Sequence, residues 1–77
     1  MIMAKENEQP DFKVTEQLAV LSRSEKGYTT ELNRVSFHGH EAKLDLRRWR
    51  SNEPLKGITL TNEEACKLLE ALQQLFQ

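Results

Sequence analysis

Disulfides, membrane spans and closed metal sites are all excluded by what this 77-residue sequence lacks. Its one cysteine, Cys66, rules out an internal disulfide and fits a reducing compartment. No apolar run approaches the roughly 18 residues that cross a bilayer, and residues 1–6 lack the apolar core of a secretory signal. Two histidines and one cysteine do not fill a closed zinc site. We therefore expect a cytoplasmic protein without membrane contact.

Catalytic signatures are missing as well. The sequence has no Ser-His-Asp order, no glycine-rich phosphate loop and no isolated pair of buried carboxylates. His38 and His40 resemble a metal pair only superficially, because Gly39 favours a turn between them and no third ligand is near. We expect no catalysis, no metal and no cofactor, and we interpret Cys66 as a half-buried structural thiol.

The apolar content is enough for folding but leaves a thin core. Leu, Ile, Val and Phe make up 19 of the 77 residues, which exceeds the ~20% below which chains usually stay disordered. A single core in a chain this short rarely supplies more than about 3–5 kcal/mol. Because a disulfide and a structural metal are not expected, self-association is the remaining way to stabilise the fold.

Charge is distributed unevenly along the chain. The net charge is −1, yet residues 42–57 carry +3, whereas residues 1–11 and 61–77 each carry −2. A local basic patch can attract a polyanion although the total charge is near zero. The same pattern is also typical of an ordinary solvated face.

The chain divides into a polar tail and one domain. Residues 1–11 lack periodicity and are expected to be flexible, whereas residues 12–77 form the domain. Alternating and β-rich segments predict four strands, at 12–22, 28–38, 42–50 and 55–60. The first is long enough to contain a bulge. Since the connections are too short for crossover helices, we expect an antiparallel meander.

A helix start follows the strands. Thr61 as N-cap and Glu64 three residues later fit a capping box and predict a helix to the C-terminus. Its apolar stripe contains Ala65, Leu68, Leu69, Leu72, Leu75 and Phe76. We therefore expect an α+β fold, with the helix covering one sheet face. A stripe this wide can also pack on a symmetric partner, so its last five members are candidate dimer-interface residues.

The third strand is the most informative segment. Leu44 and Leu46 share one parity, while the other, expected to be open, carries Lys43, Asp45, Arg47 and Trp49. Single-stranded nucleic acid calls for this combination, since cations track phosphates and an aromatic ring stacks on bases. Alternatively, Trp49 packs at the sheet edge or in a dimer interface and the cations are solvated. Asp45 is expected to pair with Lys43 or Arg47.

Other side chains are weaker candidates for the same site. Phe37 is either a core residue or a second stacking platform. Four cations are candidate phosphate contacts, with exposed solubilising charge as the alternative: Arg34, Arg48, Arg50 and Lys56.

Three segments carry a resemblance to a known family: KGYTTELNRVSFHG at 26–39, KLDLRRW at 43–49 and KGITLT at 56–61. Together they resemble the bacterial YdbC-type branch of the positive cofactor four family of transcriptional coactivators. The resemblance implies four antiparallel strands with a C-terminal helix and a homodimer formed through helix and sheet. It also implies sequence-tolerant binding of single-stranded DNA, with RNA as a second candidate ligand.

The resemblance assigns nucleic-acid contacts to particular positions: Phe37, Lys43, Arg47, Trp49 and Lys56, with Arg34 and His38 as further candidates. The chain departs from the eukaryotic members at His38, where they place a lysine, and at Val35, where they place an arginine. It also lacks their basic N-terminal region. The resemblance implies a role in transcription regulation, replication or repair, with the transcription machinery as a candidate partner and, in a bacterium, association with the nucleoid.

Two hypotheses of different classes follow. The first is a dimer that binds single-stranded DNA. The second is a non-catalytic adaptor that uses the open sheet face for a peptide. The cations expected around Trp49 favour the first, because a peptide adaptor does not need them.

Overall fold

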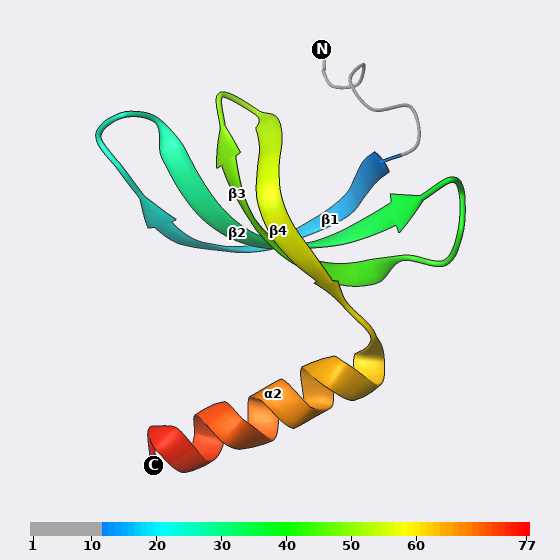
Figure 1. The fold of residues 1–77 in the computed structure, drawn as a ribbon, viewed down its shortest axis with the longest axis vertical. Coiled ribbons are helices and arrows are strands. Elements are labelled where there is room, and N and C mark those ends of the chain that lie inside the picture. Colours follow the sequence, from blue (N-terminus) through cyan, green and yellow to red (C-terminus); the bar gives the residue numbers. More distant parts are fainter. Residues whose placement is uncertain (1–11) are drawn as a thin grey trace.

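The four strands and the helix occur in the predicted order. The computed structural model describes residues 12–77, so the tail predicted for residues 1–11 lies outside the described part. The strands form one antiparallel sheet in the order β1-β2-β3-β4, followed by the helix (Figure 1). The α+β fold class is thus confirmed. The elements are β1 (Phe12–Arg23), β2 (Tyr28–Phe37), β3 (Lys43–Arg50), β4 (Glu53–Leu60) and α2 (Asn62–Leu75).

The turns explain how the hairpins close. Gly27 has φ +90°, the positive value expected of a glycine in the β1–β2 turn. Between β3 and β4 the turn has only two residues, Ser51 and Asn52, with φ of 52° and 67°. Positive φ at both central positions is typical of a tight hairpin whose twist matches that of its strands. The fourth strand, predicted to begin at residue 55, therefore begins earlier, at Glu53.

Register shifts bend the sheet. β2 and β3 pair without interruption, from Tyr28 opposite Arg50 to Val35 opposite Lys43. β1 shifts three times against β2, which confirms the bulge expected in the first strand, and β4 shifts once against β3. Each shift bends its strand and increases the local twist. The result is a strongly curved sheet (Figure 1).

The inside of this curve, here called the concave face, holds the buried core. Val35 and Asp45 are fully buried, Asn33 is 1% exposed and Trp49 is 9% exposed. Asn33 lies directly opposite Asp45 in the β2–β3 register, so both point to this face. The core is small and unusually polar for its size.

The expected orientation of the sheet was wrong. Leu44 and Leu46, expected to be covered, are only half-buried on the outer or convex face, where Ile58 is 55% exposed. The parity of Asp45 and Trp49, expected to be open, is the more buried one. Curvature causes the difference, because the sheet bends over its own concave side chains while the helix leaves the convex face largely uncovered (Figure 1).

Helix α2 begins with the predicted capping box. The Glu64 amide donates to Thr61 Oγ1 at 3.1 Å, and the Thr61 amide donates to Glu64 Oε1 at 2.9 Å. The helix stands away from the sheet, and none of its residues is buried (Figure 1). The expectation that α2 covers a face of its own sheet is therefore wrong. No helix in residues 12–77 is both long and apolar enough to span a membrane.

Candidate nucleic-acid interface

Three aromatic rings meet on the concave face. The Phe12 and Phe37 ring centroids lie 5.0 Å apart, and Phe12 lies 6.1 Å from Trp49. We call these three side chains the aromatic row. Phe12 is on β1 and Trp49 on β3, with β2 between them, so the curvature of the sheet brings the rings together. The sequence places Phe12 in the first strand but does not indicate this role, because alternation alone does not show which distant strands converge.

Trp49 is not the open stacking platform that the sequence suggested. Its ring is mostly buried, whereas Phe12 and Phe37 are half-buried and present more of their surface. Phe37 belongs to the row and is also half-exposed, so a core residue and a stacking platform both remain open interpretations of it. A base that stacks here would meet the two phenylalanines before the indole.

Arg47 lies against the aromatic row and is held in place by its neighbours. Its guanidinium carbon is 5.1 Å from the Phe12 ring centroid, within cation–π range. Nε and Nη2 donate to the two oxygens of Asp45 at 2.8 and 2.7 Å, and Nη1 donates to the Leu55 carbonyl oxygen at 2.8 Å. The hydrogen bonds to Asp45 raise the pKa of Arg47, against the opposing effect of burial, and the charge of Asp45 raises it further.

The expected pairing of Asp45 is thus confirmed with Arg47 as its partner. Thr59 Oγ1 also donates to Asp45 Oδ1 at 3.2 Å. Three of the five guanidinium N–H groups are occupied, and the positive charge is balanced by a buried carboxylate. Arg47 can still offer two N–H groups to a ligand, but it is a weaker phosphate anchor than a free arginine.

A second carboxylate lies on the concave face. Glu31 is opposite Arg47 in the β2–β3 register and accepts three hydrogen bonds. The donors are Thr29 Oγ1 at 2.6 Å, Asn33 Nδ2 at 3.3 Å and Gln17 Nε2 at 3.4 Å. Since Asp45 is balanced by Arg47, Glu31 is the carboxylate whose charge repels phosphate from this face. This face therefore suits the uncharged parts of a ligand, such as nucleobases, better than a phosphate backbone.

Two buried polar atoms of the concave face have no hydrogen-bond partner within residues 12–77. They are Asn33 Oδ1, an acceptor, and Trp49 Nε1, a donor. A buried polar atom without a partner costs about 1–3 kcal/mol. Because these two atoms lie on the same face as the aromatic rings, they favour a ligand site there that makes both apolar and polar contacts.

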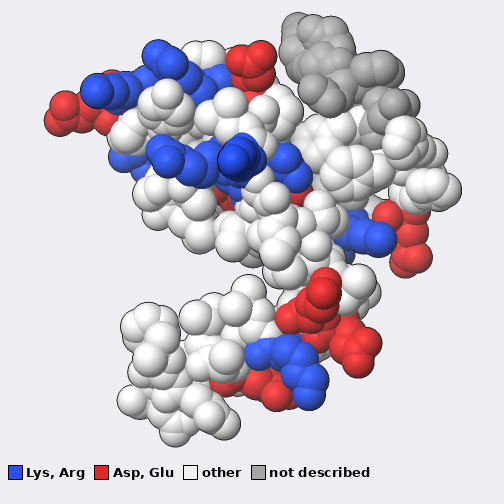
Figure 2. Space-filling model, in the orientation of Figure 1, with Lys and Arg blue, Asp and Glu red and all other residues white. Residues whose placement is uncertain are grey.

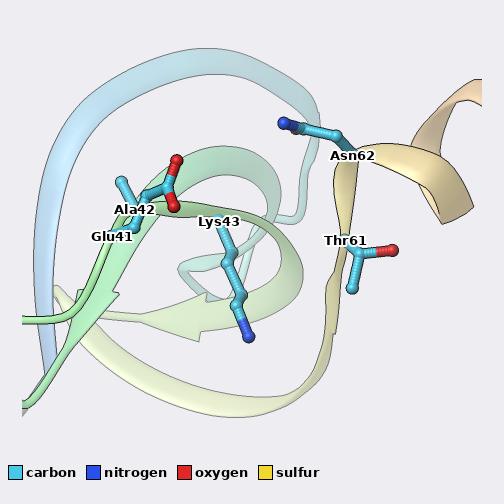
Figure 3. Close-up of a pocket in the computed structure, with 5 residues that line it drawn as sticks. All are labelled: Glu41, Ala42, Lys43, Thr61 and Asn62. Carbon is cyan, nitrogen blue, oxygen red and sulfur yellow. The ribbon is translucent and has the colours of Figure 1, made fainter.

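The cations proposed for the site are scattered over both faces. Lys43 has the concave parity and extends beside a shallow hollow between the start of β3 and the start of α2, which Glu41, Ala42, Thr61 and Asn62 also line (Figure 3). Strand alternation places Lys56 on the convex face, because its neighbour Gly57 lies opposite Arg47. The structure does not gather Lys43, Arg47 and Lys56 into one cluster.

Two further candidates are Arg34, near the C-terminal end of β2, and His38, directly after it. Arg34 Nε is 3.4 Å from Glu16 Oε1 on the convex face, in an exposed ion pair of little energetic weight. His38 follows β2 with φ 55°, and its ring centroid lies 6.3 Å from that of His40.

No group of three metal-ligating side chains occurs among residues 12–77. Cys66, expected to be half-buried, is exposed.

Arg48 and Arg50 surround Tyr28 on the convex face. Each guanidinium carbon lies 5.0 Å from the Tyr28 ring centroid, and Arg50 Nη1 donates to the Tyr28 hydroxyl at 3.3 Å. Figure 2 shows basic side chains gathered over the sheet, whereas acidic ones surround the beginning of α2. The sequence predicted both arginines as candidate phosphate contacts but did not indicate that both lie against the Tyr28 ring.

The structure thus defines a small curved-sheet protein with an aromatic, partly acidic concave face and a basic convex face. No family model matches the chain. It is 32% identical over 71 residues to an uncharacterized protein of Treponema pallidum (strain Nichols), which covers 90% of this chain and 84% of that protein. The chain belongs to the same family as that protein.

Proposed function

We propose that this protein binds single-stranded DNA with little sequence preference, using the concave face of the sheet. The observation that carries the proposal is the aromatic row of Phe37, Phe12 and Trp49, with Arg47 stacked on its central ring. Base–aromatic stacking is worth about 1–3 kcal/mol per base and tolerates any sequence, because every base has a π-face.

The charges around the row favour single strands over duplex. In a duplex the base faces are hidden by stacking and only phosphates are presented to this surface. Glu31 repels phosphates from the concave floor, because the charge of Asp45 is already balanced by Arg47, whereas unstacked bases can enter it. Lys43 at the rim and the two free N–H groups of Arg47 are the contacts left for the backbone of a bound strand.

We further propose a homodimer formed through α2. The helix has an exposed apolar stripe: Leu68 is 42%, Leu69 54%, Leu72 43%, Leu75 69% and Phe76 78% exposed. Exposed apolar area of this kind marks an interaction surface, and a second copy supplies an identical stripe. Self-association would also stabilise a chain whose own core is so small.

The proposed setting is the cytoplasm, with nucleoid association if the source is bacterial. There the protein would act without catalysis or cofactor in transcription regulation, replication or repair, with RNA and the transcription machinery as further candidate partners. The resemblance of the three segments and the accessible, unpaired Cys66 support this assignment.

The test compares an unstructured oligothymidine with a duplex of equal length at two salt concentrations. We expect the single strand to bind more tightly and the emission of Trp49, the single tryptophan, to change in parallel with binding. Phe12→Leu should weaken single-strand binding by about 1–3 kcal/mol, because it keeps apolar volume but removes a stacking ring. Leu21→Ala, an exposed position on the same strand, is the matched control.

Equal affinity for single strand and duplex, with Phe12→Leu indistinguishable from Leu21→Ala, would contradict the proposal. No binding of either nucleic acid would instead favour a peptide adaptor.

A further inference from the structure

The arrangement of Tyr28, Arg48 and Arg50, here called the arginine–tyrosine stack, is not explained by the aromatic row. It lies on the convex face, where Tyr28 is opposite Arg50 and Thr30 is opposite Arg48 in the β2–β3 register. The stack is near the end of the sheet that carries the β1–β2 and β3–β4 turns (Figure 1). Trp49 falls between the two arginines in sequence but points to the other face.

Both guanidinium groups are held at the same ring, each 5.0 Å from the Tyr28 centroid. Both arginines are exposed, and no carboxylate of residues 12–77 forms an ion pair with either. By contrast, Arg47 is neutralised by Asp45, and Arg34 is paired with Glu16. Two like charges at one ring repel each other, and an anion bound beside them reduces that repulsion.

The chemistry of the stack fits phosphate in particular. A guanidinium presents a planar fork of N–H donors that matches a phosphate group with two parallel hydrogen bonds. Tyr28 limits the motion of both forks, so less conformational entropy is lost when they bind. Strand alternation adds Lys56, an exposed cation of β4, to the same face.

We infer that the arginine–tyrosine stack is a second binding site, which takes the phosphate backbone of a nucleic acid on the convex face. The inference rests on the proposed function for its ligand class, but not on the aromatic row. The stack has no helix or strand that could contact base edges in a groove, and its contacts with phosphate do not require an unstacked base. It therefore binds single strand and duplex alike, while the concave face binds single strand alone.

The experiment measures binding against salt for the variant Arg48→Ala/Arg50→Ala of the full chain. The control is Lys13→Ala/Lys67→Ala, which removes the same charge from exposed positions away from the stack. We expect the stack variant to lose duplex binding, with the slope of log K against log salt falling by about 1.8 for two lost contacts. The control should keep both affinity and slope.

Single strands of two lengths separate the stack from the aromatic row. A strand of about 6 nucleotides, near the low end of known site sizes, should bind both variants equally, whereas one of about 20 should lose affinity only with the stack variant. Phe12→Leu should show the reverse, with weaker binding of the short strand and unchanged duplex binding. If only this result for Phe12→Leu is not obtained, the proposed function is overturned and the second site remains.

Three outcomes would overturn the inference. If the stack variant matches the control in duplex slope, these arginines do not contact phosphate. If Tyr28→Phe and Tyr28→Ala change duplex binding equally, the ring does not organise the cations. If polyglutamate of equal charge competes as well as duplex, the site is one for acidic peptides.

Discussion

Arg47 and Asp45 form a two-point ion pair along one strand, with Nε–Oδ2 and Nη2–Oδ1 distances of 2.8 and 2.7 Å. Asp45 has no exposed side-chain surface, and the Arg47 side chain is 16% exposed. A buried pair of this kind adds little net stability, because desolvation offsets the attraction. Removal of one member is costly, since the other then remains as an uncompensated buried charge.

Arg47→Ala is therefore expected to lower the free energy of unfolding by about 3–5 kcal/mol. The measurement is urea denaturation followed by circular dichroism. Arg48→Ala, at the exposed neighbouring position, should stay within about 0.5 kcal/mol of the wild type. Asp45→Leu/Arg47→Met should recover most of the loss, because packed apolar residues can replace a buried pair. Wild-type stability of Arg47→Ala would show that the pair does not form.

Trp49 is expected to contribute mainly to folding. Because its ring is 9% exposed and packs on Phe12, Trp49→Ala should cost about 3–5 kcal/mol of stability. Unfolding followed by circular dichroism measures this cost, since the variant has no tryptophan to report by fluorescence. Leu21→Ala, at an exposed position, provides the comparison. If both variants unfold at the same urea concentration, Trp49 is not a core residue.

Gly57 is predicted to tolerate no side chain. A Cβ atom at this position would overlap the Cβ of Arg47 and come within 2.7 Å of the Leu46 carbonyl oxygen. Gly57→Ala should destabilise the fold by about 1–3 kcal/mol, because β3 and β4 must separate to make room. Lys56→Ala on the same strand should be nearly neutral. A melting temperature for Gly57→Ala equal to that of Lys56→Ala would refute the close approach.

The exposed stripe of α2 provides a test of assembly. Light scattering of the wild type should give about twice the 9.0 kDa chain mass. Leu72→Glu should return the species to the monomer mass, because a charge would be buried without a partner at the interface. Gln73→Glu adds the same charge on the polar side of the helix and should leave the dimer intact. Equal masses for the two variants would exclude this face as the interface.

The element order could be predicted from the sequence, because local signals specify it. Thr61 and Glu64 marked the helix start through a capping box that the structure contains. The turn between the first two strands contains Gly27, whose φ of +90° a glycine adopts without strain. The β3–β4 turn was harder to delimit, since Ser51 and Asn52 adopt positive φ without a glycine.

Which face of the sheet is the more buried one could not be predicted from the sequence. Alternation separated Asp45 and Trp49 from Leu44 and Leu46 correctly, but apolar content suggested the wrong pair for the core. The deciding factor is curvature, which depends on register shifts such as that between Arg47 and Trp49. Apart from the bulge suggested by the length of the first strand, these shifts could not be located from hydrophobic periodicity. The contact between Phe12 and Trp49 follows from the same curvature and was therefore missed.

The meander order of the strands has a consequence for folding kinetics. Every strand pairs with its neighbour in the chain, so the contacts that build the sheet close short loops, which favours fast folding. Helix α2 contributes no buried residue to that sheet. We expect the sheet to form in a fast step independent of protein concentration, and the proposed dimer to form in a slower step whose rate rises with concentration. In rapid-mixing experiments the chain should thus pass through a folded monomer whose apolar helix is briefly open to any competing surface.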